Sequence, residues 1–173
     1  RNSDALALQA NSAVALNYHE VNPYVFAEPT SPHIVSADEG RPIELAQLSA
    51  GLRHLEQNAD WLLTEGAGGW FTPLSEQHTF ADWVQQEQLP VILVVGIKLG
   101  CINHAVLTAQ AIQQAGLSLV GWIAKDVSPP GRRHQEYLAT LRRMLPAPLL
   151  GEIPHLPKPE RQALGHYLDL SVL

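Results

Sequence analysis

The sequence has a single cysteine, Cys101, among its 173 residues, so no disulfide can form within the chain. One cysteine also excludes a zinc knuckle, and it fits the reducing cytoplasm better than secretion. The longest apolar runs, such as residues 90–97, are far shorter than the ~20 residues that cross a bilayer. We therefore predict a cytoplasmic protein that has no membrane-spanning segment.

Positive charge is also scarce, with 11 Lys and Arg against 17 Asp and Glu and a net charge of −6. This balance argues against nucleic acid or an anionic membrane as the main partner. The basic stretch at 132–143 is interpreted as a solvated helix face. With 46% apolar and 16% charged residues, the chain has an ordinary globular composition, and its length suits a single domain, residues 1–173.

Strand and helix patterns alternate along the chain. Leu45, Leu48, Leu52 and Leu55 recur at helical spacing, whereas 91–96 is a continuous β-branched run typical of a central, buried parallel strand. The alternation predicts an α/β fold with a doubly wound, mostly parallel sheet. The predicted helices are 2–10, 43–57, 79–88, 103–115 and 132–144; the predicted strands are 60–64, 91–96, 117–124 and 148–153; and 22–43 is predicted to be a long loop.

Ligands of such sheets bind at the carboxyl ends of the strands. Glu65 ends the first predicted strand and is followed by Gly66, Ala67, Gly68 and Gly69. A carboxylate in that crevice needs a cation such as Mg²⁺, and small residues let the backbone N–H groups approach phosphate. A tight turn with a solvated glutamate explains the same string, so both interpretations stay open.

The segment after the second strand, GIKLGCINHA, places Gly100, Cys101, Ile102 and Asn103 at the start of a helix that Asn103 can cap. The first turn of a helix offers free N–H groups to a carboxylate or phosphate. Cys101 is interpreted as a small packed residue rather than a nucleophile, because only His104 lies nearby. The eight histidines form no metal-binding pattern.

Five strings, in order and spacing, resemble the dethiobiotin synthetase family across essentially the whole chain. The strings are RNSDALALQ, VNPYVFAEPTSPHIVSADEGRPIE, EGAGGWFTPL, LPVILVVGIKLGCINHAVLTAQAI and PAPLLGEIP. The resemblance implies a P-loop NTPase-like fold and an ATP-dependent ligase of biotin biosynthesis. That ligase carboxylates 7,8-diaminononanoate with CO₂, phosphorylates the carbamate and closes a cyclic urea, giving dethiobiotin, ADP and phosphate.

The resemblance also implies a homodimer whose active site is shared between subunits, with Asp4 and Glu65 as Mg²⁺ ligands. The implied ATP contacts are Asp4, Glu65, Gly66, Ala67, Gly68, Lys125, Asp126, Pro154, His155, Leu156 and Glu160. The implied contacts of the substrate carboxylate, across the dimer interface, are Gly100, Cys101, Ile102 and Asn103.

Two features depart from the family pattern. The chain contains no GxxxxGK[ST] string, so the N-terminal strand, the phosphate loop and a carbamate-binding lysine are expected before Arg1, and no catalytic residue is expected within the chain. Lys125 stands where the family usually has asparagine. Lysine offers only donors, so adenine selectivity is weakened or rests on the backbone and Asp126.

Alternative interpretations follow from these departures. The chain is either a piece of a longer protein, which we favour because loss of a central strand would expose unpaired edges, or a truncated product without activity. Another ATP-dependent ligase or a ParA-like ATPase shares the EGAGG string. A non-catalytic dimerisation module becomes reasonable if Arg1 is the true start.

Overall fold

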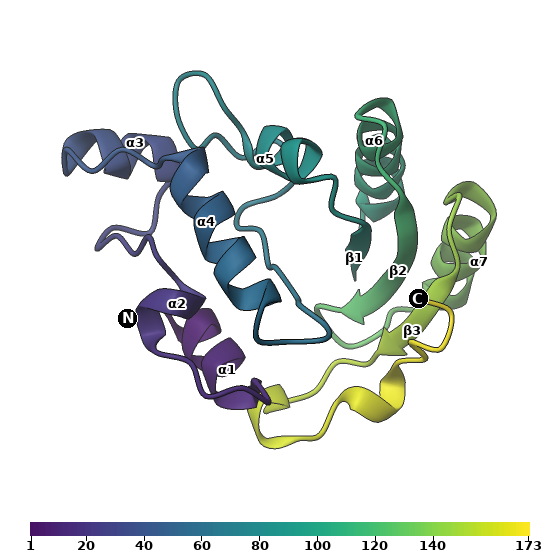
Figure 1. Ribbon diagram of the computed structural model, residues 1–173. Coiled ribbons are helices and arrows are strands. Elements are labelled where there is room, and N and C mark those ends of the chain that lie inside the picture. Colours follow the sequence, from purple (N-terminus) through teal and green to yellow (C-terminus); the bar gives the residue numbers. More distant parts are fainter. The chain divides into compact units, whose positions relative to one another are not determined.

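The computed structural model describes residues 1–173, which divide into two compact units, Arg1–Glu87 and Gln88–Leu173 (Figure 1). The N-terminal unit contains α1 (Ser3–Asn11), α2 (Tyr18–Val21), α3 (Pro32–Asp38), α4 (Leu45–Glu56) and α5 (Phe80–Glu87). The C-terminal unit contains β1 (Val91–Ile97), α6 (Cys101–Gln114), β2 (Leu119–Asp126), α7 (His134–Met144), β3 (Leu149–Ile153), η1 (Pro159–Arg161) and η2 (Gly165–Tyr167). No helix is both long enough and apolar enough to cross a membrane.

The C-terminal unit is built on a parallel sheet in the order β1-β2-β3. This arrangement confirms the predicted α/β class and parallel pairing. The prediction that residues 91–96 form a central strand is wrong, because β1 pairs with β2 alone and β2 occupies the middle. An unbroken apolar run reports how apolar the two faces are, and it does not report how many strands lie alongside.

A continuous core lies between one face of this sheet and the helices α6 and α7 (Figure 1). Alternate strand residues point to the same face, so Trp122 and Ala124 of β2 both face the helices. Small residues on α6 let the helix lie close to the sheet, and α7 adds two leucines that are fully buried. The remaining members of the core are Val95, Ile97, Cys101, Ala105, Ala109, Leu138, Leu141 and Leu145.

The end of the chain returns to the outer side of β3. Gly151 forms an isolated antiparallel bridge with Leu168, and the amide of Asp169 donates to the carbonyl of Leu150 at 2.7 Å. A Cβ atom on Gly151 would lie 2.0 Å from the backbone oxygen of Tyr167. Only glycine allows the two backbones to approach this closely.

The N-terminal unit depends on polar side chains at its helix ends. The predicted helix at 2–10 is confirmed as α1. Its cap is Asn2, whose side-chain oxygen accepts from the amides of Asp4 and Ala5 at 2.8 and 3.0 Å. The helix predicted behind Thr79 is confirmed as α5. The Thr79 amide donates to the carboxylate of Asp82 at 2.6 Å, which fixes the first turn of this helix.

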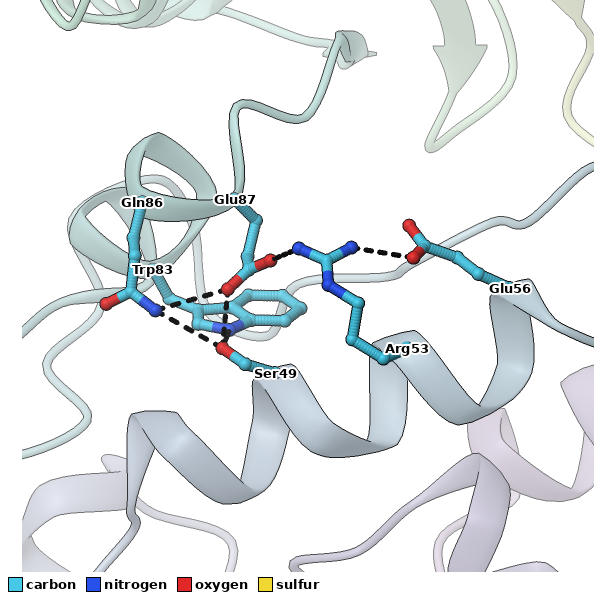
Figure 2. Close-up of polar contacts among 6 residues, drawn as sticks. All are labelled: Ser49, Arg53, Glu56, Trp83, Gln86 and Glu87. Atoms are coloured by element: carbon cyan, nitrogen blue, oxygen red, sulfur yellow. Dashed lines mark hydrogen bonds and ion pairs between the residues drawn. The ribbon is translucent and has the colours of Figure 1, made fainter.

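Helices α4 and α5 are joined through the indole of Trp83, which is buried (Figure 2). The indole N–H donates to the hydroxyl of Ser49 at 3.1 Å, and that hydroxyl donates in turn to the carboxylate of Glu87 at 2.5 Å. The side-chain amide of Gln86 donates to the hydroxyl of Ser49 and to the carboxylate of Glu87. The buried indole N–H and the carboxylate of Glu87 therefore both have partners, as buried polar groups require.

Arg53 extends the junction along α4 by pairing with both Glu87 and Glu56 (Figure 2). The side chain of Glu87 is only 5% exposed. The hydrogen bond from Ser49 is the main influence that holds the pKa of Glu87 below its usual range, with Gln86 and Arg53 adding to it and burial opposing it. The carboxylate is thus kept charged although little water reaches it.

Two predictions for the N-terminal unit are wrong. Residues 60–64 form no strand, and Trp61 and Leu63 are 60% and 57% exposed. A strand is maintained by pairing, and no strand of the chain pairs with this segment, so its apolar pattern alone does not produce one. The predicted loop at 22–43 contains the short helix α3, which begins with Pro32 in its first turn, a favoured position for proline.

Candidate functional site

The carboxyl ends of the three strands bring together the candidate residues of the C-terminal unit. Gly96, Lys125 and Ile153 lie side by side in the register of β1, β2 and β3. Because parallel strands end at the same edge, the segments that follow them share that edge. The loop into α6 and the segment after β3 therefore lie at one edge of the sheet, on either side of the end of β2, as the sequence predicted.

Lys125 connects two of these ends directly. Its Nζ donates to the carbonyl oxygens of Asp126 and Pro154, each at 3.0 Å. The side chain is half-buried, and both bonds are made to uncharged acceptors. The structure therefore brings together Lys125 and Pro154, two of the expected nucleotide contacts that lie far apart in the sequence.

Asp126 follows Lys125 in the same strand, so its side chain points to the opposite face of the sheet. That side chain belongs to one of two buried polar residues, and its Oδ1 lies 2.7 Å from Nε2 of His134 in the first turn of α7. A carboxylate engaged in this way does not share the surroundings of the Lys125 ammonium. Of Asp126, only the backbone carbonyl contacts the Lys125 ammonium.

The other expected contacts after β3 are more open to solvent. Pro154 and Leu156 are half-buried, whereas His155 and Glu160 are exposed. Glu160 lies in the short helix η1, with its carboxylate 4.0 Å from the guanidinium of Arg161. The segment thus offers a half-buried apolar surface with charged groups at its margin, an arrangement that suits a flat heterocycle.

The first turn of α6 begins after Gly100, which adopts a left-handed conformation with φ +89°. The prediction that Asn103 caps this helix is wrong, because the cap position is Gly100 and Asn103 is an exposed residue within the first turn. The amide of Cys101 donates to the carbonyl of Lys98 at 3.1 Å. The amides of Ile102 and Asn103 have no protein partner and remain free to bind an anion.

Cys101 is 2% exposed and belongs to the core over the sheet. Its thiol packs against apolar neighbours, in agreement with the interpretation of a small packed residue. The sulfur of Cys101 therefore has almost no access to solvent, and the amide of this residue is already bonded to Lys98.

A hollow of about 350 Å³ lies beside this turn, between the ends of β1 and β2 and the start of α7. We call it the strand-end hollow, and its lining includes Lys98, Arg132, Arg133 and Tyr137 as well as the bonded pair Asp126 and His134. The two arginines were predicted to lie on a solvated face, and the sequence pattern gave no site role to Lys98 or Tyr137. The position of Lys98 directly after a predicted strand was the available signal.

The candidate metal and phosphate residues belong to the N-terminal unit. Asp4 lies exposed in the first turn of α1, where its Oδ1 accepts a hydrogen bond from Ser3 at 3.1 Å. Glu65 begins an exposed loop, contrary to the prediction that it ends a buried strand. No group of three or more histidine, cysteine or carboxylate side chains gathers into a metal-binding cluster.

The loop at 65–69 depends on glycine at its turn. Gly68 has φ +77°, and a Cβ atom there would lie 2.6 Å from the hydroxyl oxygen of Thr72. The following residue, Gly69, also has a positive φ, and its carbonyl accepts from the amide of Thr72 at 3.2 Å. The loop therefore exposes its backbone in a conformation that side chains would disturb.

Comparison with known proteins places this chain in a family. The family model described as an AAA domain matches residues 1–163. The ATP-dependent dethiobiotin synthetase of Serratia marcescens is 77% identical over 174 residues, a match that covers all of this chain and 77% of the relative. The chain belongs to the dethiobiotin synthetase family.

Two further dethiobiotin synthetases show the same extent of similarity. That of Escherichia coli strain K12 is 72% identical, with all of this chain and 77% of the relative covered. That of Salmonella typhimurium strain LT2 is 74% identical, with all of this chain and 76% of the relative covered. All the site residues expected from the dethiobiotin synthetase resemblance fall within the residues that the family model matches.

Proposed function

We propose that the chain carries out the ATP-dependent conversion of 7,8-diaminononanoate and CO₂ to dethiobiotin, with release of ADP and phosphate. Its membership of the dethiobiotin synthetase family makes it a ligase of biotin biosynthesis that forms carbon–nitrogen bonds. The observation that carries the proposal is 77% identity to a named dethiobiotin synthetase along the whole chain. The residues gathered at the carboxyl ends of the strands support the same proposal.

Each compact unit is proposed to supply the nucleotide with contacts of its own. In the N-terminal unit, the exposed backbone of the loop beginning at Glu65 contacts its phosphates. In the C-terminal unit, Lys125, Asp126 and the segment after β3 contact its base. The two units are proposed to be parts of a single domain, because the family model runs through both of them.

The proposed metal is Mg²⁺, held by Asp4 and Glu65. Both are exposed carboxylates, and no protein cation pairs with either of them. Oxygen ligands of this kind fit Mg²⁺, which takes one or two carboxylates and completes its shell with phosphate oxygens and water. When bound, the metal would neutralise the charge that develops on the transferred phosphoryl group.

The carboxylate of the diamine is proposed to bind at the first turn of α6, where the segment Gly100–Asn103 presents two free amides. Lys98, Arg132 and Arg133 line the adjacent strand-end hollow and add positive charge. This anchor would fix the far end of the substrate and orient its two amines for ring closure. We further propose that the enzyme works as a cytoplasmic homodimer in which one subunit supplies this anchor to the other.

The direct test is Glu65→Gln in the complete natural protein. Loss of a ligand charge should lower kcat with MgATP by about 100-fold or more, because a metal supplies several kcal/mol of charge stabilisation to phosphoryl transfer. Initial-rate kinetics and titration calorimetry with MgATP measure the effect. Glu76→Gln is the control, since Glu76 is another exposed glutamate of the same unit. An unchanged rate for Glu65→Gln would contradict the metal role.

A further inference from the structure

The ammonium of Lys125 is committed to two carbonyl groups at the ends of β2 and β3. A lysine ammonium has three N–H donors and no acceptor. Two of the donors are used by the carbonyls of Asp126 and Pro154, each at 3.0 Å, and the third has no partner in the protein. The side chain therefore presents one fixed donor, with its positive charge, at the place where the proposed function puts the base of the nucleotide.

Asp126 does not supply the acceptor that an adenine amino group needs. Its carboxylate lies on the opposite face of β2 and is bonded to His134 at 2.7 Å. The carbonyls of Asp126 and Pro154 each keep a second lone pair, but the Lys125 ammonium lies between them. An amino group that approached these oxygens would meet the positive charge of the ammonium, which disfavours it.

Purine bases differ at the edge that such a donor would contact. Adenine presents the acceptor N7 beside the donor N6–H₂, whereas a 6-oxopurine presents two acceptors, N7 and O6. A single N–H donor can bond to N7 of either base. The 6-oxopurine alone places a second acceptor next to the ammonium, so the charge of Lys125 favours that base and does not reject adenine.

We propose that Lys125 is a specificity-determining residue that makes the base site accept 6-oxopurine nucleoside triphosphates at least as well as ATP. The inference rests on the proposed function, because it assumes that the base lies at the ends of β2 and β3. It concerns the nucleotide alone and leaves the carboxylation and ring closure unchanged.

The test compares ATP with inosine triphosphate, whose base carries oxygen in place of the amino group at position 6. With Mg²⁺, CO₂ and diaminononanoate, the complete natural protein should show a kcat/KM for inosine triphosphate equal to or above that for ATP. In Lys125→Asn, an amide that both donates and accepts should shift this ratio about tenfold toward ATP. Arg143→Asn is the control, because Arg143 is an exposed cation in the last turn of α7, outside the proposed base contacts, and the ratio should stay unchanged.

The ratio of the two kcat/KM values separates selectivity from stability. A merely structural role of Lys125, as a tie between two strand ends, would lower both values together and leave their ratio unchanged. The ratio of the unmodified protein needs no variant, so the test holds even if Lys125→Asn folds poorly.

Three outcomes would count against the inference. A kcat/KM for inosine triphosphate below that for ATP overturns it and leaves the proposed function standing. The same ratio in Lys125→Asn as in the unmodified protein overturns the role of this lysine. Failure to turn over either nucleotide contradicts the proposed function, and the inference fails with it.

Discussion

The two compact units hold their candidate residues in different ways. In the C-terminal unit, Lys125 and Pro154 occupy the ends of paired strands that rest on a continuous core. In the N-terminal unit, Glu65 and the glycines after it lie on an exposed loop, and the helices are joined by polar side chains around Trp83. Side-chain packing fixes the first set, whereas backbone conformation fixes the second.

This difference teaches where each unit is sensitive to change. A sheet transmits a backbone shift to every strand that pairs with it, so a close contact within β3 should be costly to disturb. An exposed loop relaxes more easily, and a change of Glu87 to glutamine keeps one oxygen that can accept the hydrogen bond from Ser49. Three substitutions test these expectations. The loss in the free energy of unfolding should decrease in the order Gly151→Ala, Gly68→Ala, Glu87→Gln, and a different order would contradict the comparison.

Gly151→Ala should have the largest effect. The new methyl group would lie 2.0 Å from the backbone oxygen of Tyr167, so β3 and the returning chain must move apart. We expect a loss of about 3 kcal/mol in the free energy of unfolding, measured by urea denaturation. Gly165→Ala is the control, because nothing lies within 4 Å of its added Cβ, and it should change stability by less than about 0.5 kcal/mol. Equal effects would refute the packing argument.

Gly68→Ala should have an intermediate effect on the loop that follows Glu65. Alanine at φ +77° is strained by about 1–2 kcal/mol, and its methyl group would also press against Thr72. Denaturation should show a loss of about 2 kcal/mol, close to that strain. Gly66→Ala, in the same loop and with open space around it, should cost less than about 0.5 kcal/mol. Equal losses of stability in the two variants would show that the loop does not require glycine at residue 68.

Glu87→Gln should have the smallest effect at neutral pH, about 1 kcal/mol for the altered hydrogen bonds. In the unmodified protein the pKa of Glu87 is held below its usual value, so the charged form stabilises the folded state at pH values above the unfolded pKa of about 4.3. This contribution disappears as the pH falls through the folded pKa. The stability of Glu87→Gln, followed by denaturation between pH 7 and 3, should therefore decline less steeply than that of the unmodified protein.

Glu56→Gln serves as the matched control for the loss of a carboxylate beside Arg53. Glu56 pairs with the same Arg53, but its side chain is 42% exposed. The change should cost less than about 0.5 kcal/mol, because exposed pairs are screened by water. A steeper acid decline in Glu87→Gln than in the unmodified protein would contradict the assigned role of Glu87.

The helices and the sheet strands were predictable where local patterns suffice. The leucine spacing in 43–57 predicted α4, and Leu52 is indeed buried there. The β-branched run predicted β1, and its position in the sheet was the part that failed. Residues 60–64 show the limit of the same reasoning, because a short apolar pattern is a strand only when another strand pairs with it.

The candidate site was predictable as a set of segments and less so as a set of contacts. The segments after β1, β2 and β3 were expected at one edge, and the register places them there. The bond between Asp126 and His134 was not expected, and neither was the use of the Cys101 amide by Lys98. Both hydrogen bonds depend on the direction in which a loop turns, and the neighbouring residues in the sequence do not specify that direction.

The sequence by itself determined the helical and strand periodicities, the glycines that the turns require and the strings that mark the family. Only the tertiary structure decided that Lys125 reaches Pro154, 29 residues away, while Asp126 turns to the other face. The physical reason is range. Local patterns arise from neighbours within one or two turns of the chain, whereas pairing and the choice of hydrogen-bond partner depend on residues that only folding brings together.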